Sequence, residues 1–318
     1  MSTWYNACDK AAALIRESVP AHYRSRTFPG IIGDIKALSS KKALSLISRK
    51  KGLGKQYAWL YLTQGIDQGR GYQACAVEAL DAVFGAHREE IIHGRILDAG
   101  CAVGVTAGIL SLNHIVGFDL FTDLLKAAGL TDSFTGTENL YVTADMTHDW
   151  PFGCVFDTVV CGMVCHHLKK QKDVVTFFRN ANRVLRPGGS LIVTLPAGSV
   201  AYSGQLENII DGLEGFGFQA DREYSGLVRS ADDPHSLFWM FLIVARKVSD
   251  TVGRTFISPD FAFPQYRTPE TREEKGEKAR STSTTNRKVK HKRFELIDSN
   301  VLRSRYGEKT FVFSEVST

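Results

Sequence analysis

Apolar runs of strand length alternate with helix-like segments across the middle of the chain, from residue 95 to residue 247. The apolar runs are RILDAG, IVGFDL, LYVTADM, FDTVVCGMV, GSLIVTLPA and SLFWMFLIVARK. Segments with helical spacing, such as FTDLLKAAGL and QKDVVTFFRNANRVL, lie between them, and RPGG at 186–189 is the turn expected to end the second. This alternation predicts βαβ units, and therefore an α/β fold with a doubly wound, mainly parallel sheet.

The two ends of the chain follow different patterns. Residues 1–90 read as a helical N-terminal extension with helices at NACDKAAALIRESV, KKALSLISRK and QACAVEALDAVFG. The central domain is expected to span residues 91–248. Residues 249–318 form a basic tail, and its charged, Ser/Thr-rich stretch predicts partial disorder. The tail ends in two strand-like pieces, RFELIDSN and KTFVFSEV, which either pair as a terminal hairpin or wait for a partner.

Charge is distributed unevenly along the chain. Residues 1–70 carry a net charge of +8 (12 basic and 4 acidic residues), residues 71–250 carry −8, and residues 251–318 carry +5. Basic ends occur in proteins that bind nucleic acid, and they are as common as plain solvated surface. The stretch KKALSLISRKKGLGKQYAWLYL, within residues 36–70, therefore has two interpretations. It is either an RNA-binding surface or an amphipathic helix that buries Trp59, Leu60 and Leu62, and we favour the helix.

Composition disfavours several classes of protein. No apolar run approaches the ~18 residues of a membrane-spanning helix, and the N-terminus has no basic head followed by a long apolar block. Six cysteines are scattered along 318 residues without a C-x-x-C pair, so neither a disulfide scaffold nor a zinc ribbon is indicated. We therefore predict reduced thiols, no metal site, no membrane contact and a cytoplasmic location.

The stretch ILDAGCAVGV marks the candidate ligand site. A buried-looking strand ends near Asp98, and Gly100 and Gly104 flank a tight turn into a helix that begins near Val105. Glycines at such a turn permit positive φ and let a ligand approach the backbone closely. The dinucleotide pattern G-x-G-x-x-G fails at Ala102 and Val105, and no Gly-Lys-Ser/Thr follows, so a phosphate-binding loop is disfavoured.

This stretch resembles the first motif of class I S-adenosylmethionine-dependent methyltransferases, an acidic residue followed by a glycine-rich turn. Asp98, Gly100 and Gly104 match the motif, and Ala102 replaces its middle glycine. The resemblance extends over about residues 70–247, because FDTVVCGMVCHHL and NRVLRPGGSLIVTLP also follow the family pattern. It implies a seven-stranded sheet of the class I methyltransferase fold and S-adenosyl-L-methionine as the cofactor of the central domain.

The resemblance also implies roles for residues at the ends of the strands. Asp119 ends the second apolar run, where a carboxylate is expected to accept hydrogen bonds from both ribose hydroxyls. Asp145 and Met146 follow the third run, where an acceptor for the adenine amino group and a backbone N–H for a ring nitrogen are expected. Asp119 as a helix N-cap and Asp145 as a turn cap are the structural alternatives. The full expected set of cofactor-binding residues is Asp98, Gly100, Cys101, Ala102, Gly104, Asp119, Leu120, Asp145, Met146, Cys161 and Gly162.

Methyl transfer is an in-line displacement, so such a site mainly aligns the acceptor and, for an oxygen or amine acceptor, removes a proton. His166 and His167, just beyond the fourth run, are the candidate bases, because imidazole titrates near neutrality. A structural role, with the ring bonded to backbone, is the alternative for each. Cys161 and Cys165 beside His166 are assigned to core packing rather than to a metal, since no fourth ligand is in view.

Motifs that the sequence lacks narrow the choice of methyl acceptor. The Asn/Asp-Pro-Pro-Tyr/Phe motif of amino-methylating DNA enzymes is missing after the fourth run, and no Pro-Cys of a cytosine C5 enzyme occurs. A small-metabolite acceptor is favoured, with residues 1–90 as a lid in which GIDQGRGYQA closes over the cofactor. The alternatives are RNA, bound through basic residues 36–70 and the tail, and a non-catalytic scaffold of the same fold. The acceptor atom, the oligomeric state and the purpose of the tail stay open.

Overall fold

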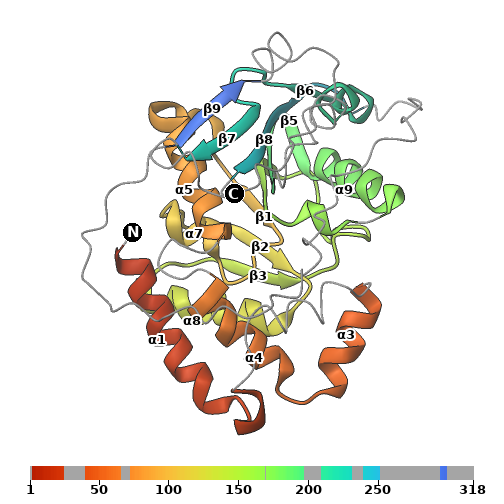
Figure 1. Cartoon of the computed structure of the whole chain (residues 1–318). Helices are drawn as coiled ribbons and strands as arrows, with labels where there is room; N and C mark the ends of the chain where they lie inside the picture. The colour runs from red at the N-terminus through yellow and green to blue at the C-terminus, as the bar shows by residue number, and fades with distance from the viewer. Residues whose placement is uncertain are drawn as a thin grey trace, which may run out of the picture.

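The computed structural model describes residues 2–24, 40–65, 72–168, 170–196, 209–230, 239–250 and 294–298. A mixed sheet runs through this part of the chain in the order β3-β2-β1-β4-β5-β8-β7-β9, with β6 paired to β8 beside β7 (Figure 1). Its parallel half consists of β1 (Ile96–Ala99), β2 (Val116–Asp119), β3 (Leu140–Thr143), β4 (Phe156–Gly162) and β5 (Leu185–Pro196). The predicted α/β fold with a doubly wound, mainly parallel sheet is confirmed.

The other half of the sheet differs from the seven strands that were expected, because the described residues form nine. β8 (Trp239–Lys247) runs antiparallel to β5, and both β6 (Phe218–Ala220) and β7 (Gly226–Ser230) pair with β8. A single strand position is thus interrupted between Ala220 and Gly226. Ser225 closes the interruption, since its hydroxyl donates to the Val244 carbonyl (3.1 Å) and accepts the Val244 N–H (3.0 Å).

The ninth strand comes from the tail. β9 (Phe294–Asp298), the first of the two strand-like pieces, pairs antiparallel with β7 at the edge of the sheet. The second piece, KTFVFSEV, and the rest of the tail lie outside the described residues, as does most of GIDQGRGYQA. The terminal hairpin and the partial disorder therefore stay predictions.

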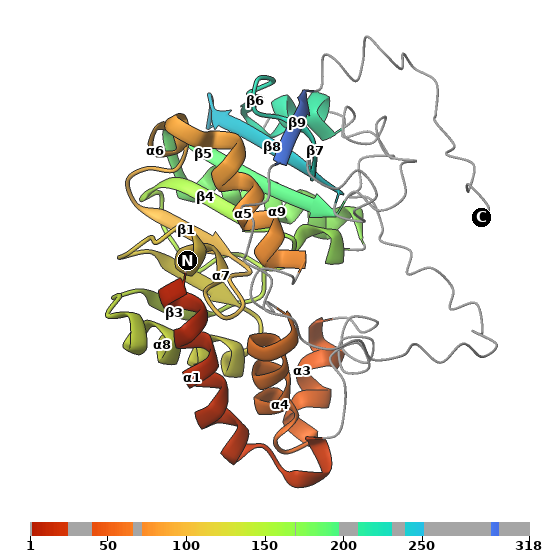
Figure 2. The ribbon, with the colours of Figure 1, turned by 60° about the vertical axis from the view of Figure 1, so that its left-hand side comes forward.

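Helices cover both faces of the sheet (Figure 2). α1 (Ser2–Ser18), α4 (Leu53–Leu60), α5 (Tyr72–Phe84), α7 (Val105–Ile109) and α8 (Thr122–Thr135) contribute to one core, and α9 (Gln171–Val184) and η6 (Leu213–Phe216) contribute to the other. The strands serve both cores by alternation, as in β4, where Val159 and Cys161 face α9 and Val160 faces α5. The remaining described elements are η1 (Ala21–Tyr23), α3 (Ser40–Arg49), η2 (Tyr61–Gly65), η4 (Gly85–His87), α6 (Arg88–Ile91) and η5 (Cys165–His167).

The N-terminal helices pack directly on the central domain. The Trp4 indole of α1 fills the space that a Cβ on Gly108 of α7 would need, and the Asp123 carboxylate of α8 does the same at Gly54 of α4. Leu60 and Leu62 are buried, as the amphipathic interpretation predicts, and Trp59 is half-buried against the same core. The basic stretch forms two helices rather than one.

The break between those helices has a local cause. Gly52 adopts φ +90° between α3 and α4, a left-handed conformation that ends one helix and starts another at little cost only for glycine. Helices from residues 1–90 share one hydrophobic core with the sheet. The predicted domain boundaries stay predictions.

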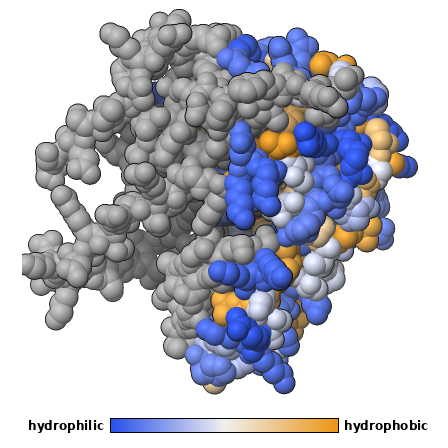
Figure 3. Space-filling view, turned by 90° about the vertical axis from the view of Figure 1, so that its right-hand side faces the viewer, coloured by the Kyte–Doolittle hydropathy of each residue, from blue (hydrophilic) through white to orange (hydrophobic). Residues whose placement is uncertain are grey.

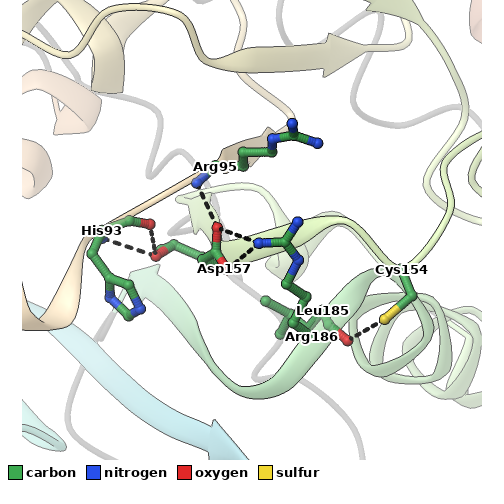
Figure 4. Close-up of polar contacts among 7 residues, drawn as sticks. His93, Arg95, Cys154, Asp157, Leu185 and Arg186 are labelled. Carbon is green, nitrogen blue, oxygen red and sulfur yellow. Dashed lines mark hydrogen bonds and ion pairs between the residues drawn. The ribbon is translucent and has the colours of Figure 1, made fainter.

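Asp157, at the amino end of β4, bonds to the start of β1 and to β5 (Figure 4). Its Oδ2 accepts the Arg95 N–H (2.8 Å), and its Oδ1 pairs with the Arg186 guanidinium (3.1 Å). The Arg95 hydrogen bond and then Arg186 hold the pKa of Asp157 below its usual range.

α9 ends at Val184, before the predicted turn, and β5 bulges over 186–189, where Gly188 has φ +77°. No helix in the described part of the chain is long and apolar enough to cross a membrane.

Candidate functional site

The glycine-rich turn follows β1 and is held by its own backbone. The Gly100 and Cys101 N–H groups donate to the Phe118 carbonyl (2.8 and 3.0 Å), and the Gly104 N–H donates to the Cys101 carbonyl (2.9 Å). Gly100 and Gly104 have φ of +80° and +76°, as a turn of this type predicts. Ala102 is also left-handed, at φ +50°, which costs a residue with a Cβ about 1–2 kcal/mol. Strained backbone of this kind is concentrated at functional sites.

Asp119, the last residue of β2, ties this turn to the next helix. Its Oδ2 accepts the Ala102 N–H (3.1 Å), and its Oδ1 accepts the Phe121 N–H (3.1 Å). The N-cap of α8 is Phe121, which makes no side-chain capping bond, so the alternative of Asp119 as the α8 N-cap is wrong. Burial raises the pKa of Asp119 to about 6, although its hydrogen bonds to Phe121 and Ala102 oppose this.

Asp98, the third residue of β1, is only 1% exposed. Within the described part of the chain, neither of its oxygens has a hydrogen-bond partner of ordinary geometry. Burial raises its pKa to about 7; the nearby Thr106 side chain lowers it, and the charge of Asp119 raises it further. A buried carboxylate in this condition calls for a cationic or hydrogen-bonding ligand.

Asp145 follows β3 and sits in a turn. Its Oδ1 accepts both the N–H and the hydroxyl of Thr147 (2.9 and 2.8 Å), and its Oδ2 lies 3.3 Å from Nδ1 of His148. The next residue, Met146, accepts the indole N–H of Trp150 on its carbonyl (3.3 Å). The turn-capping alternative therefore describes the contacts of Asp145 in this structure, and its adenine-binding role stays a prediction.

The end of β4 holds the remaining expected residues. Cys161 and Cys165 are fully buried with their sulfur atoms 3.1 Å apart, and burial raises the pKa of Cys165 well above its ordinary value. All six cysteines are free thiols. Gly162 is buried, and a Cβ there would be in ordinary van der Waals contact with the hydroxyls of Thr106 (3.8 Å) and Thr194 (3.9 Å). No group of three metal-ligating side chains occurs among the described residues.

The two candidate bases lie in η5, directly after β4. The rings of His166 and His167 are 3.8 Å apart between centroids, tilted by 50°, and both residues are half-buried. Met163, which links β4 to this turn, has φ +57° and donates its N–H to both oxygens of Thr194 (3.1 Å each). The histidines are thus at the same edge of the sheet as the glycine-rich turn, and their catalytic role stays a prediction.

The parallel register brings the expected residues to one edge of the sheet. Ala99 is level with Phe118, Asp119 with Thr143, and Gly162 with Thr194, so β1, β2, β3, β4 and β5 end side by side. Open α/β sheets bind ligands at this edge. Hydrogen bonds join Gly104 to Cys101 and Ala102 to Asp119. Asp98 and Gly100 belong to the same turn, Leu120 follows Asp119, and the neighbouring strand ends hold Asp145, Met146, Cys161 and Gly162.

Sequence reasoning missed an aromatic group at this edge. Tyr57 of α4 lies with its ring 5.9 Å from that of Tyr61 in η2 and 5.6 Å from that of Phe121, both contacts being edge-to-face. Burial, and then the charge of Asp119, raises the pKa of Tyr57. The i, i+4 spacing of the two tyrosines in QYAWLYL was the available signal, but it does not say which side of the helix meets the site.

Comparison with known proteins agrees with this geometry. Residues 97–193 match the family model described as "Methyltransferase domain". The central part of the chain is therefore similar to methyltransferase domains. The matched segment begins in β1 and ends in β5, so it contains the glycine-rich turn and all the expected site residues.

Two curated relatives and a solved structure resemble parts of the chain. "Putative methyltransferase YqeM" of Bacillus subtilis is 33% identical over 102 residues, 31% of this chain and 41% of that protein. "Ribosomal RNA small subunit methyltransferase C" of Hahella chejuensis is 34% identical over 108 residues, 31% of each chain. The structure of an S-adenosylmethionine-dependent methyltransferase from Mesorhizobium loti is 15% identical with a TM-score of 0.40, and the match covers 53% of this chain and 99% of that chain. The chain thus spans less than half the length of these curated relatives.

The residues of the site fit the cofactor that the family implies. Asp98 is a buried carboxylate that still needs a partner, and S-adenosylmethionine carries an ammonium group and a sulfonium. At Gly104 of the glycine-rich turn, the position of a Cβ lies 2.8 Å from the Tyr141 hydroxyl and 3.6 Å from the Ala128 methyl group, so only glycine leaves the backbone accessible there. Binding of such a cofactor would explain why the Asp98 carboxylate and the glycine-rich turn lie at the same edge of the sheet.

Proposed function

We propose that the protein is an S-adenosylmethionine-dependent methyltransferase that transfers a methyl group to an oxygen or nitrogen atom of a small metabolite. The observation that carries the proposal is the buried, unsatisfied Asp98 carboxylate beside a glycine-rich turn that Asp119 holds in place. A scaffold without a ligand gains nothing from a buried carboxylate of raised pKa, because its ionisation costs folding free energy.

Each group of site residues binds a different part of the cofactor or acts on the acceptor. Asp98 and the turn from Gly100 to Gly104 bind the amino-acid part of the cofactor, and Asp119 with Leu120 binds its ribose. Asp145 and Met146 bind the adenine, while Cys161 and Gly162 form the floor at the end of β4. The bound cofactor supplies an electrophilic methyl group on a sulfonium. His166 or His167 accepts the proton that an oxygen or amine acceptor loses as its bond to the methyl carbon forms.

A small acceptor is supported by the enclosure of this edge. The Tyr57 ring packs against the rings of both Tyr61 and Phe121, and Met163 is only 8% exposed. Apolar and aromatic walls with a few polar groups are typical of small-molecule sites. The free thiols of all six cysteines support the cytoplasm as the compartment.

RNA is a second candidate acceptor, and a specific observation favours it. The described residues 40–65 contain six basic residues and no acidic residue. All six are exposed (Figure 3 shows the described surface on the side of α3); they are Lys41, Lys42, Arg49, Lys50, Lys51 and Lys55. A basic surface next to α4 suits a phosphate backbone, and a ribosomal RNA methyltransferase is among the relatives.

The first experiment is calorimetric titration of the full chain with S-adenosylmethionine and, separately, S-adenosylhomocysteine. We expect micromolar binding, and we expect Asp119→Ala to weaken it by about 1.5–3 kcal/mol through the loss of charge-assisted hydrogen bonds. Asp149→Asn, a change at an exposed aspartate before β4, is the matched control and should bind as the unaltered protein does. No binding by a folded sample would favour the scaffold.

A salt titration separates the two acceptors. If RNA is the acceptor, binding of a single-stranded RNA oligonucleotide should weaken steeply between about 50 and 200 mM salt, and replacing Lys41, Lys42 and Arg49 by Gln should flatten the slope. A weak, sequence-independent affinity that these three changes leave unaltered would leave the small metabolite as the acceptor to screen.

A further inference from the structure

Two tyrosines of the N-terminal extension belong to an aromatic cluster that reaches Asp119 through Phe121. Tyr57, only 7% exposed, belongs to α4, and Tyr61 opens the π-helical turn η2 directly after it. Tyr57 is the centre of an aromatic cluster, with ring centroids 5.9 Å from Tyr61 and 5.6 Å from Phe121. Such π-turns are uncommon and are often found at functional sites.

The cluster is connected to the glycine-rich turn through one backbone group. The N–H of Phe121 donates to Oδ1 of Asp119, whose Oδ2 accepts the Ala102 N–H. Tyr57 packs edge-to-face on the Phe121 ring, so it bears on the residue whose backbone fixes one oxygen of Asp119. Displacing this ring is therefore expected to move the carboxylate that the proposed function assigns to the ribose.

Tyr61 adds a polar group at the same place. It is half-buried, and its pKa lies well above the ordinary value because of burial first, and then because of Tyr57, Asp119 and Asp98. Its phenol is consequently protonated over the whole physiological range and is able to donate a hydrogen bond.

The helix that carries these tyrosines is fixed to its surroundings. Gly54, in the first turn of α4, packs against the Asp123 carboxylate of α8. Gln56 is fully buried and donates its side-chain N–H to the Tyr23 carbonyl. Contacts on both sides hold α4 against the central domain, so the tyrosines are placed by specific packing.

We propose that Tyr57 and Tyr61 complete the cofactor site. Tyr61 is a cofactor-binding residue whose hydroxyl bonds to the polar groups that S-adenosylmethionine brings beside Asp98 and Asp119. Tyr57 is a positioning residue that acts through Phe121 on Asp119. This inference rests on the proposed function, and it makes the N-terminal extension part of the binding site rather than a separate lid.

The test is calorimetric titration of full-length variants with S-adenosylhomocysteine. Tyr61→Phe removes the hydroxyl and keeps the ring, and we expect affinity to fall about 3- to 10-fold, which is the effect of one hydrogen bond. Tyr57→Leu removes the edge-to-face contact and should weaken binding to a similar extent, while Tyr57→Phe, which keeps the ring, should restore it. The matched control is Tyr5→Phe, because the Tyr5 hydroxyl of α1 bonds to Glu78.

Each outcome has a distinct meaning. Thermal unfolding of the ligand-free variants shows which of them fold, and the increase in Tm on adding S-adenosylhomocysteine gives a second measure of binding. Equal affinity for Tyr61→Phe and the unaltered protein overturns the inference and leaves the proposed function standing, with Tyr61 as core packing. A loss of affinity in Tyr5→Phe as large as in Tyr61→Phe also overturns it. If the unaltered protein binds neither S-adenosylmethionine nor S-adenosylhomocysteine, the proposed function fails and the inference fails with it.

Discussion

Asp98→Asn is the substitution for which the structure makes the sharpest prediction. Because the folded protein keeps the Asp98 proton up to about pH 7, whereas the unfolded chain releases it near 3.8, folding takes up a proton between these values. The stability associated with the protonated carboxyl is therefore fully present below pH 4 and is lost as the pH rises through 7. The difference between the two pKa values is worth about 4 kcal/mol above pH 7, as an order of magnitude.

The asparagine variant removes this cost but adds a smaller one. Its amide has no charge to desolvate, while its buried N–H₂ donors still lack partners, which costs about 1–3 kcal/mol. At pH 8 we therefore expect the ligand-free variant to be about 1–3 kcal/mol more stable than the unaltered protein, although it binds the cofactor less well. Between pH 5 and pH 8 the unaltered protein should lose about 2–3 kcal/mol more stability than the variant.

Urea unfolding followed by tryptophan fluorescence measures this difference, because Trp4 and Trp150 are buried at 5% and 2% exposure and report on the two cores. Some dependence on pH should persist in the variant, since burial also raises the pKa of Asp119, to about 6. Asp149→Asn, at an exposed site, should follow the unaltered protein at every pH. The reasoning is refuted if Asp98→Asn has the same pH dependence as the unaltered protein at an unchanged m-value.

Two further substitutions test the glycine-rich turn and the packing of the sheet. Gly104→Ala should lower the free energy of unfolding by about 1–3 kcal/mol, because φ is +76° and the new methyl group would meet the Tyr141 hydroxyl. The control is Gly136→Ala, where φ is +73° but no atom lies within 4 Å, so only the backbone cost is present. An equal loss of stability in both variants would contradict the proposed contact with Tyr141. Lys247→Met should cost about 2–4 kcal/mol in thermal unfolding. Lys247 is only 3% exposed, and its ammonium donates to two carbonyls at the α9–β5 junction (2.8 Å each) and pairs with Asp250. A neutral result would show that water satisfies the carbonyls.

Much of the fold could be predicted from local pattern. A strand that serves two cores needs apolar residues on both faces, so the parallel strands appear as continuous apolar runs, and their helices appear as periodic ones. The same locality explains the errors. The interrupted strand around Ser225 depends on contacts with Val244, and the pairing of β9 depends on β7, about 70 residues earlier in the chain. Neither contact leaves a periodic signal.

The candidate site shows the same division between local and distant causes. The sequence by itself determined the glycine-rich turn and the acidic residues at the ends of the strands, because positive φ and the register of a parallel sheet are local requirements. Only the tertiary structure showed that Asp119 is not the N-cap of α8 and that its carboxylate bonds to Ala102, 17 residues away in the sequence. Only the tertiary structure brought Tyr57 against Phe121, two residues after Asp119, because packing between distant segments, rather than any local preference, selects which face of α4 meets the site.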